Sequence, residues 1–339
     1  MKQIVFTKIN TAELLDVPVV SPSDRQVLVR TAFSTVSCGT ERANITGNPN
    51  NSLAPLPENA APVFPRCLGY SSSGIVEEIG SAVTSVKPGD RVAVYCGHHK
   101  EYNTVDENNV VKITDERVSL EEAAMLYIAS FPLAALRKTR LEIGESMLIM
   151  GLGLLGQLAV QLAHAAGAVP VIAADPIAER RADALSLGAD HALDPFEKDF
   201  AEQVKRLTEG GVNTAIEVTG VGAGLNETLD CMAKFGRVAL LGCTRDPNFT
   251  VDYYRKIHGP GITLIGAHTQ ARPEYESHPG WFTHRDDMRA LMKLIAGGRI
   301  DLARMIKETY LPSDCPAVYT RLIQDKNFPT VVQFDWSKQ

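Results

Sequence analysis

The sequence lacks the cysteine patterns that stabilise small secreted domains or bind structural zinc. Its six cysteines are spread along the chain, and the nearest pair, Cys231 and Cys243, is twelve residues apart. Without a C-x-x-C pair, neither a zinc ribbon nor a thioredoxin-like motif is present. The first residues also lack the long apolar run of a secretory signal. We therefore expect a cytoplasmic protein with reduced thiols.

Positive charge is scarce as well. The chain has 34 Lys and Arg against 40 Asp and Glu, a net charge of −6, and no basic stripe, which argues against a nucleic-acid partner. Residues 146–174 contain no Asp, Glu, Lys or Arg, but four glycines and Pro170 interrupt them. This segment fits strand, turn, helix and strand better than a bilayer-spanning helix, so we expect no membrane association.

The first hundred residues alternate apolar and polar side chains over the short segments 26–33, 73–80 and 90–96. Turn signals such as the Pro-Gly-Asp sequence at 88–90 lie between these segments, and the pattern predicts an irregular β-barrel. Residues 47–66 are rich in proline, which predicts a mobile or lid-like loop.

The pattern changes at Ser119, which forms a capping box with Glu122 and starts a helix. Strands then alternate with helices, as in a parallel sheet. We predict an α/β fold with a doubly wound cofactor domain over 119–284 and a barrel domain over 1–118, completed by 285–339. Strands are expected at 145–151, 169–175, 191–195, 214–220, 237–242, 262–268 and 330–336, and helices at 154–167, 176–187, 197–208, 223–234 and 285–298.

A glycine-rich turn marks the expected cofactor site. The motif G-x-G-x-x-G, formed by Gly151, Leu152, Gly153, Leu154, Leu155 and Gly156, follows an apolar strand and opens a helix. In this context the first glycine permits the tight turn, the second lets a pyrophosphate approach, and the third lets the helix pack closely. The N–H groups at the start of the helix would then face the anion. The alternative is a tight turn without a ligand.

An acidic residue follows at the expected distance. Asp175 lies nineteen residues after Gly156, at the end of the next strand, where a carboxylate binds the adenosine ribose and repels a 2′-phosphate. The cofactor is therefore expected to be NAD rather than NADP. Arg180 and Arg181 complicate this assignment, since one could flank the adenine or both could be solvated.

Two later strand ends should also reach the cofactor. Thr219 and Gly220 follow one strand, and Gly242 and Cys243 follow another. Ligands of open parallel sheets bind beyond the carboxyl ends of the strands. The alternative is that these residues form ordinary turns.

The landmarks occur together in a specific order. Gly69 and Gly74 precede VEEIG, and PGDRVAV, EYNTVDENNVVKI, EEAAML, GLGLLG, Asp175, EVTG and GRVALLG follow. In this order the chain resembles the zinc-type medium-chain dehydrogenase/reductase superfamily over nearly its whole length. The resemblance implies a GroES-like catalytic domain, a Rossmann cofactor domain and alcohol–ketone interconversion. It also suggests a homodimer in which strand 262–268 pairs with its symmetry mate.

The zinc positions of that superfamily are altered in this chain. Cys38 matches the first catalytic ligand, but Tyr70 follows Gly69 where the family has Gly-His, and the third ligand position falls near Tyr127. The four-cysteine structural lobe is also missing. With Gly39-Thr40-Glu41, these changes resemble a zinc-lacking branch that includes bacteriochlorophyllide hydroxyethyl dehydrogenases. The resemblance implies hydride transfer with NAD and no bound metal.

Without zinc, a side chain must take the hydroxyl proton. Tyr70 is the candidate base, and a nearby cation would lower its pKa from about 10. Alternatively, Tyr70 merely lines a pocket. The cation could come from His98, His99 or Lys100, although both histidines could instead lie in a solvated turn. Thr40 and Glu41 could form a proton relay, or they could be a helix turn and a surface acid. Cys38 is more simply a buried thiol than a nucleophile, and the remaining alternative is that it binds another metal with His98 or His99.

The substrate is expected to be a small molecule. Segment 267–285 has no apolar periodicity, so it would border the site or form a mobile cover. Its donors favour a polar cyclic substrate such as a sugar or cyclitol, unless most of them are solvated. The candidates are Arg42, Asn44, Arg272, Tyr275, His278, Trp281 and His284. Two alternative functions are a zinc-independent NADPH-dependent quinone or enoyl reductase and a non-catalytic NAD-binding protein.

Overall fold

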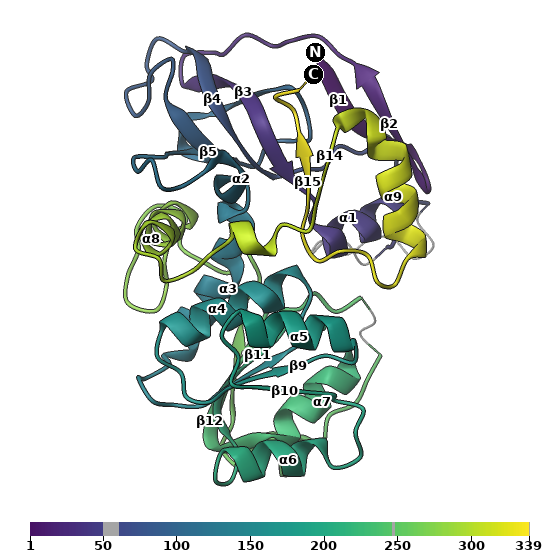
Figure 1. The fold of residues 1–339 in the computed structure, drawn as a ribbon, viewed down its shortest axis with the longest axis vertical. Coiled ribbons are helices and arrows are strands. Elements are labelled where there is room, and N and C mark those ends of the chain that lie inside the picture. Colours follow the sequence, from purple (N-terminus) through teal and green to yellow (C-terminus); the bar gives the residue numbers. More distant parts are fainter. Residues whose placement is uncertain (50–60, 246–247, 339) are drawn as a thin grey trace. The chain divides into compact units, whose positions relative to one another are not determined.

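The computed structural model describes residues 1–49, 61–245 and 248–338 of the chain. Positions 50–60 of the expected proline-rich loop therefore lie outside the described residues. The chain divides into two compact units, the first formed by Met1–Ile128 with Met288–Gln339 and the second by Ala129–Asp287. Each unit has its own sheet and its own core (Figure 1).

The first unit is built on a seven-stranded sheet with antiparallel pairing over most of its strands. Strands expected at 26–33, 73–80 and 90–96 are present as neighbours (Figure 1). The strands are β3 (Gln26–Thr35), β4 (Ser71–Ile79), β5 (Arg91–Tyr95), β6 (Tyr102–Asp106), β7 (Val110–Lys112), β14 (Glu308–Tyr310) and β15 (Val332–Asp335), beside the hairpin β1 (Lys2–Lys8) and β2 (Thr11–Asp16).

Valines fill the interior of this sheet. Val27, Val29 and Val92 are completely or almost completely buried in one cluster, as expected for β-branched side chains on a pleated surface. A second cluster joins α1 (Cys38–Ile45) and α9 (Cys315–Gln324) through Phe6, Tyr319 and neighbouring apolar residues. This second cluster positions the first turn of α1, which carries several candidate catalytic residues.

The helix expected from Ser119 begins there but is divided in two. The Ser119–Glu122 capping box is present, and α2 (Leu120–Ala123) is followed by α3 (Leu126–Thr139). Strand side chains satisfy the carbonyl groups of α2 and the residue after it: Ser73 donates to Leu120, Gln333 to Glu121, and Thr35 and Ser71 to Ala124. The short helix is thereby fixed to the barrel.

The second unit is a six-stranded, all-parallel sheet in the order β10-β9-β8-β11-β12-β13, which is the doubly wound arrangement. Its strands are β8 (Met147–Met150), β9 (Val171–Ala174), β10 (His191–Leu193), β11 (Val212–Glu217), β12 (Met232–Leu240) and β13 (Thr263–Gly266). Its helices are α4 (Leu154–Ala165), α5 (Ala178–Ser186), α6 (Phe200–Leu207) and α7 (Gly222–Asp230), and α8 (His284–Ala296) starts in it (Figure 1). Short helical turns occur at Glu107–Asn109, Tyr254–His258, Ala303–Met305 and Pro312–Asp314.

One predicted boundary in this unit is wrong. The helix expected over 223–234 ends at Asp230, and β12 begins at Met232 rather than near Arg237. Met232 pairs with Val212 of β11, so sheet pairing overrides the local helical pattern. At the edge of the sheet, β13 leaves Thr263 and Leu264 exposed.

The uncharged stretch 146–174 folds as β8, α4 and β9, as the sequence predicts. In the part of the chain that the structure describes, no helix has both the length and the apolar character needed to cross a membrane.

Candidate active site

The glycine-rich turn has the geometry that its motif requires. Gly151 follows β8 with a positive φ of +99°, a conformation that favours glycine. A Cβ on Gly156 would lie 1.9 Å from the carbonyl oxygen of Gly151, whereas a Cβ on Gly153 would meet nothing within 4 Å. The third glycine therefore permits close packing, and the second faces open space. Leu154 and Leu155 form the first turn of α4 behind them.

Asp175 follows β9 and is almost fully buried. Its Oδ2 accepts the N–H of Leu152 at 2.9 Å, and its Oδ1 accepts the N–H of Ile177 at 2.9 Å. The carboxylate expected to face a ribose thus also ties the glycine turn to the end of β9. Arg180 lies 3.7 Å from Oδ2, and Arg181 donates to the Asp175 carbonyl at 2.7 Å. Both arginines therefore have partners at this strand end.

Glu217, at the end of β11, is a residue that the sequence reasoning missed. It is buried, and its carboxylate accepts the N–H groups of Thr219 at 2.8 Å and Gly220 at 3.2 Å, together with the Thr219 hydroxyl. Burial raises the pKa of Glu217. The sequence signal for this residue was the acid at the start of EVTG, because a carboxylate at a strand end can accept the N–H groups of the turn that follows it.

Three strand ends meet at the carboxyl edge of this sheet. A Cβ on Gly242 would lie 2.3 Å from the Gly220 nitrogen, and one on Gly220 would lie 2.5 Å from the Cys243 carbonyl oxygen. A Cβ on Gly151 would lie 3.0 Å from Cγ2 of Thr219. The structure thus brings together the turns after β8, β11 and β12, which contain the residues expected to bind the cofactor.

In the first unit, tyrosines at two altered zinc positions lie together. The rings of Tyr70 and Tyr127 meet edge to face with centroids 5.5 Å apart, and Tyr127 stacks on Tyr95 at 5.1 Å. The Tyr70 hydroxyl forms a hydrogen bond with the hydroxyl of Ser37. The structure therefore gives Tyr70 a serine partner that the sequence did not predict. Its only signal in the sequence was its place directly before Cys38.

Cys38 is half-buried, and its thiol lies near backbone carbonyl oxygens. Sγ is 3.8 Å from the carbonyl oxygens of Val36 and Pro329 and 3.9 Å from that of Thr330. These contacts are those of a small, partly buried thiol acting as a weak donor, which agrees with the simpler interpretation of this residue.

Glu41 and His99 are not the surface acid and solvated turn allowed as alternatives. They are 0% and 1% exposed, and the imidazole Nε2 lies 3.2 Å from each carboxylate oxygen. The Tyr319 hydroxyl donates to the same carboxylate at 2.6 Å. On the other side of the ring, Nδ1 lies 2.7 Å from the Ser34 hydroxyl, which also accepts the indole N–H of Trp336 at 2.9 Å. We refer to these five residues as the Glu41 network.

The remaining catalytic candidates lie around this network. Burial lowers the pKa of His98 to about 4, so the ring is neutral at pH 7, and this histidine is half-buried. Burial also lowers the pKa of Lys100, whose ammonium interacts with the Cys67 thiol. Thr40 is half-buried in the first turn of α1, and its carbonyl accepts the Asn44 side-chain amide at 2.9 Å.

The residues present do not fit a catalytic zinc. Over 1–49, 61–245 and 248–338, no group of three His, Cys, Asp or Glu side chains could hold a metal ion. Catalytic zinc needs three protein ligands, and two of the three family positions carry phenols here. Of the two histidines considered as partners of Cys38 for another metal, His99 has both ring nitrogens beside Ser34 and Glu41.

Segment 267–285, expected to border the site or to form a mobile cover, contacts α3 and its neighbours through several polar groups. Arg272 contacts Asp287 at 3.2 Å and donates to the Ser130 carbonyl at 2.9 Å. Lys138 donates to the carbonyl oxygens of Gly266 and Ala271. The segment is therefore held through buried charged groups near its start and its end.

Other substrate candidates have structural partners as well. The Lys138 ammonium lies 4.5 Å over the Trp281 ring, and Trp281 forms a β-bridge with His278. His284 lies 3.0 Å from the Ser130 hydroxyl, and burial lowers its pKa to about 3. In the first unit, Arg42 donates to the Leu322 carbonyl at 2.8 Å. Tyr275, by contrast, is 83% exposed.

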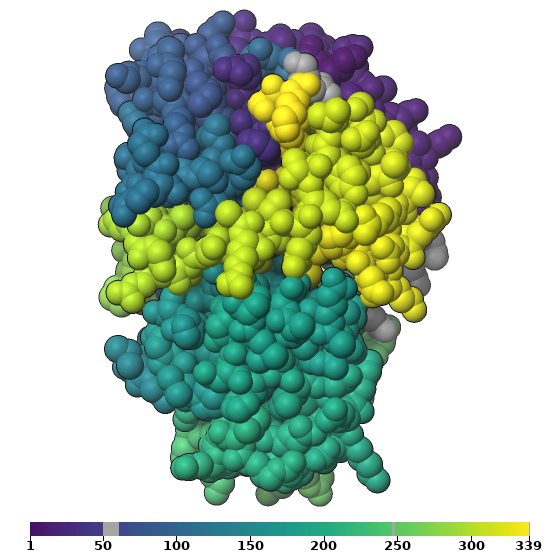
Figure 2. Space-filling view, in the orientation of Figure 1, coloured from purple at the N-terminus to yellow at the C-terminus, as the bar shows by residue number. Residues whose placement is uncertain are grey.

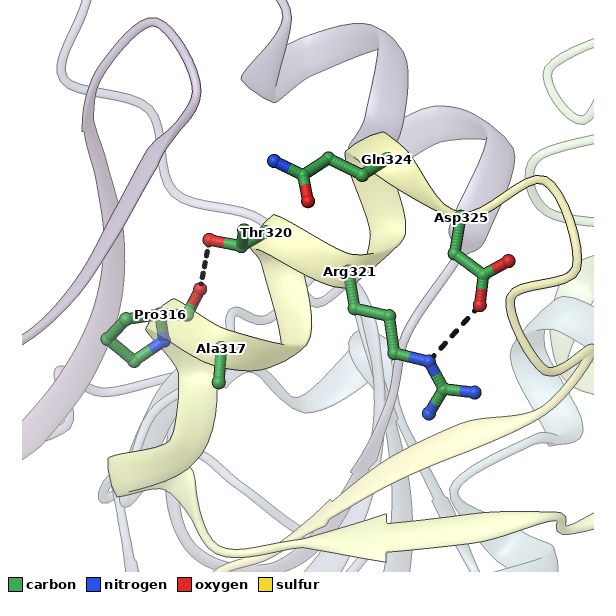
Figure 3. Close-up of a pocket in the computed structure, with 6 residues that line it drawn as sticks. All are labelled: Pro316, Ala317, Thr320, Arg321, Gln324 and Asp325. Carbon is green, nitrogen blue, oxygen red and sulfur yellow. Dashed lines mark hydrogen bonds and ion pairs between the residues drawn. The ribbon is translucent and has the colours of Figure 1, made fainter.

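A surface depression of about 600 Å³ runs along α9 and does not involve the candidate residues (Figure 3). The C-terminal segment that contains α9 lies on the molecular surface, in yellow in Figure 2. Arg321 in this depression pairs with Asp325 at 3.3 Å and with Glu308 at 2.7 Å. The lining residues are Pro316, Ala317, Thr320, Arg321, Gln324 and Asp325. We assign it no chemistry.

Two family models match the chain. Residues 23–115 match the alcohol dehydrogenase GroES-like domain, and residues 155–283 match the zinc-binding dehydrogenase domain. The first match falls on the barrel strands with the Tyr70 site, and the second falls on the parallel sheet with the glycine turn.

Curated relatives share sequence over most of the chain. L-threonine 3-dehydrogenase from Pyrococcus horikoshii is 29% identical over 336 residues, covering 88% of both chains. (R,R)-butanediol dehydrogenase from Bacillus subtilis is 30% identical over 258 residues, covering 66% of this chain and 73% of that protein.

Solved structures share the fold. A short chain alcohol dehydrogenase from Escherichia coli, in complex with NADH, has a TM-score of 0.83 at 19% identity, covering 99% of each chain. A Sinorhizobium meliloti protein classed as a zinc-binding dehydrogenase and bound to NADP has a TM-score of 0.79 at 22% identity, covering 98% of each chain.

Proposed function

This chain belongs to the zinc-type medium-chain dehydrogenase/reductase superfamily, and we propose that it is a member that uses NAD(H) to interconvert a secondary alcohol and a ketone without catalytic zinc. The observation that carries this proposal is the contact between two tyrosines, Tyr70 at the position of one family zinc ligand and Tyr127 near the position of another. An alcohol-type oxidoreductase activity follows from the family itself.

The second unit has the residues to hold a dinucleotide. The open side of Gly153 offers the approach for a pyrophosphate, while Thr219 lies against Gly151 and the Gly242–Cys243 turn lies against Gly220. Asp175 supports NAD over NADP, because a buried carboxylate at this strand end disfavours a 2′-phosphate. The bound dinucleotide would supply the hydride acceptor or donor.

Tyr70 is the group that we assign to the substrate proton. In the oxidative direction the phenolate form of Tyr70 accepts the proton of the substrate hydroxyl and becomes a phenol, and in the reductive direction the phenol returns that proton to the ketone oxygen. Ser37, hydrogen-bonded to Tyr70, gives the phenol a defined orientation. This role replaces the alkoxide stabilisation that zinc supplies in other members.

The substrate is proposed to be polar, such as a sugar, a polyol or a cyclitol. The names of the two relatives describe enzymes for threonine and butanediol, molecules in which a secondary hydroxyl stands beside another polar group. We also propose that the protein is a homodimer through residues 262–268, supported by the exposed edge of β13.

Three measurements on the purified protein test these proposals. Metal analysis should find well under one zinc per chain, and turnover should survive a chelator. NADH should bind more tightly than NADPH, and a panel of sugars, polyols, cyclitols and diols should yield NAD-dependent turnover. Zinc-dependent turnover would contradict the metal-free mechanism. A preference for NADPH would favour a quinone or enoyl reductase, and cofactor binding without turnover would favour a non-catalytic protein.

A further inference from the structure

We propose that Ser37 is the positioning residue for Tyr70, and that the Glu41 network holds Ser37 in that role. This inference rests on the proposed function, in which Tyr70 exchanges the substrate proton. It adds to that function the set of contacts that orients the Tyr70 phenol, which is formed by residues that are distant along the chain.

The first observation concerns the start of α1. Ser37 is the N-cap residue of this helix, yet its side chain makes no capping hydrogen bond. A serine at this position normally accepts an N–H from the first turn of the helix, which stabilises the helix. Here its hydroxyl is bonded to Tyr70 instead. The serine therefore gives up its usual local partner for one contributed by another element.

Glu41 takes over the connection between the N-cap residue and the first turn. Its carboxylate accepts the N–H of Ser37 at 2.8 Å, and its own N–H donates to the Ser37 carbonyl at 2.8 Å. Both backbone groups of Ser37 are thus fixed by one residue, which leaves the serine hydroxyl available to Tyr70.

The rest of the network fixes Glu41. His99 lies beside both carboxylate oxygens, and the Tyr319 hydroxyl donates to one of them. Burial raises the pKa of Tyr319, so this phenol remains a donor. A carboxylate that only held a helix end could do so at the surface, where the desolvation cost of several kcal/mol would be avoided. Because Glu41 is completely buried beside His99 and Tyr319, its carboxylate has one fixed orientation. That orientation in turn fixes Ser37.

A hydroxyl suits this role in both states of Tyr70. Serine can accept a hydrogen bond from a protonated phenol and donate one to a phenolate. The Ser37–Tyr70 bond can therefore persist while the phenol gains and loses the substrate proton. An alanine at position 37 would leave the Tyr70 hydroxyl without this partner in either state.

The test uses Ser37→Ala with Ser37→Thr as the conservative variant. The full-length protein is labelled with [13Cζ]tyrosine, and Tyr70→Phe assigns the resonance of Tyr70. That resonance should move in Ser37→Ala, return toward its original position in Ser37→Thr, and stay in place in Ser85→Ala. The last variant removes a hydroxyl bonded to Glu107 rather than to Tyr70. An unchanged resonance in Ser37→Ala would overturn the proposal.

The role of the network is tested by Glu41→Gln, which keeps a side-chain oxygen but loses the charge. The Tyr70 resonance should move in the same direction as in Ser37→Ala while the near-ultraviolet circular dichroism stays native. A folded Glu41→Gln protein with an unmoved Tyr70 resonance would overturn the network's part of the proposal. If this variant does not fold, His99→Gln replaces it with the same expectation.

Kinetics provide a second readout once a substrate is known. Ser37→Ala should lower kcat about tenfold with KM within about twofold, because the lost hydrogen bond is made to a group that ionises during the reaction. Ser37→Thr should restore most of kcat. A uniform rise in KM at constant kcat would contradict a positioning role. The NMR test needs no turnover, so failure to find a substrate would count against the proposed function and not against the Ser37–Tyr70 relationship.

Discussion

The carboxylate of Asp175 accepts the backbone N–H of Leu152 at 2.9 Å, which ties the end of β9 to the glycine-rich turn after β8. Asp175 therefore has two proposed roles: it holds the glycine-rich turn in shape, and it discriminates NAD from NADP. They can be separated because only the second needs the negative charge.

Asp175→Asn should separate these roles. The amide keeps one acceptor oxygen, so unfolding in urea should show a loss of only about 1 kcal/mol, whereas Asp175→Ala should lose about 2 kcal/mol or more. Without the charge, the preference for NADH over NADPH should fall, as measured by fluorescence titration of both cofactors. Arg180→Ala, which removes the cation 3.7 Å from Asp175, should strengthen that preference. An unchanged cofactor ratio in Asp175→Asn would show that the carboxylate does not discriminate.

The second and third glycines of the motif should respond differently to substitution by alanine. A Cβ on Gly156 would lie 1.9 Å from a carbonyl oxygen, so Gly156→Ala should cost about 3 kcal/mol or more in thermal unfolding. Gly153→Ala meets open space and should cost no more than about 1 kcal/mol. It should nevertheless weaken NADH binding at least tenfold, because the methyl group stands where the pyrophosphate approaches. A folded Gly153→Ala protein that binds NADH normally would place the cofactor elsewhere.

Such local features could be predicted from the sequence, whereas distant contacts could not. The Ser119–Glu122 capping box and the glycine turn each depend on a few consecutive residues. Glu41 meets His99 across 58 residues and Tyr319 across 278, and no periodicity connects these positions. The family resemblance located Tyr70 and Tyr127, but the partner of Tyr70 emerged only when α1 and β4 were placed together.

His98 should make the protein less stable in acid. Burial lowers its pKa in the folded state from 6.5 to about 4, so between these values the unfolded chain binds a proton that the folded chain does not. This contribution is fully present above pH 6.5 and is lost as the pH falls through 4. His98→Asn should therefore reduce the loss of stability between pH 7 and pH 5 by roughly 2 kcal/mol. Urea unfolding at pH 7, 6 and 5 measures it.

The comparison for His98 is His191→Asn, at a position outside the candidate site whose histidine is half-exposed. This variant shows how much of any change comes from replacing a histidine by asparagine elsewhere in the chain. If His98→Asn shows the same slope as the wild type, the folded protein protonates His98 near its ordinary pKa.

Substitutions in the edge strand β13 test the proposed homodimer directly. Leu264 is exposed there at 37%, and a two-fold pairing of this edge would bring two copies of the residue together. Leu264→Glu should convert the dimer to a monomer in multi-angle light scattering, because like charges would oppose each other across the interface. Glu substitution at Val169, an exposed position away from this strand, should leave the mass unchanged. A monomeric wild-type protein would contradict the dimer.

The reactivity of Lys138 reports how often segment 267–285 opens. Its pKa is lowered by burial to about 8, which in an accessible lysine would give rapid acylation near neutral pH. The ammonium is held by the carbonyl oxygens of Gly266 and Ala271 under the Trp281 ring, and the residue is only 6% exposed. An acylating reagent can therefore reach it only when this segment opens. The rate of Lys138 modification, measured by mass spectrometry, therefore reports the rate or extent of that local opening.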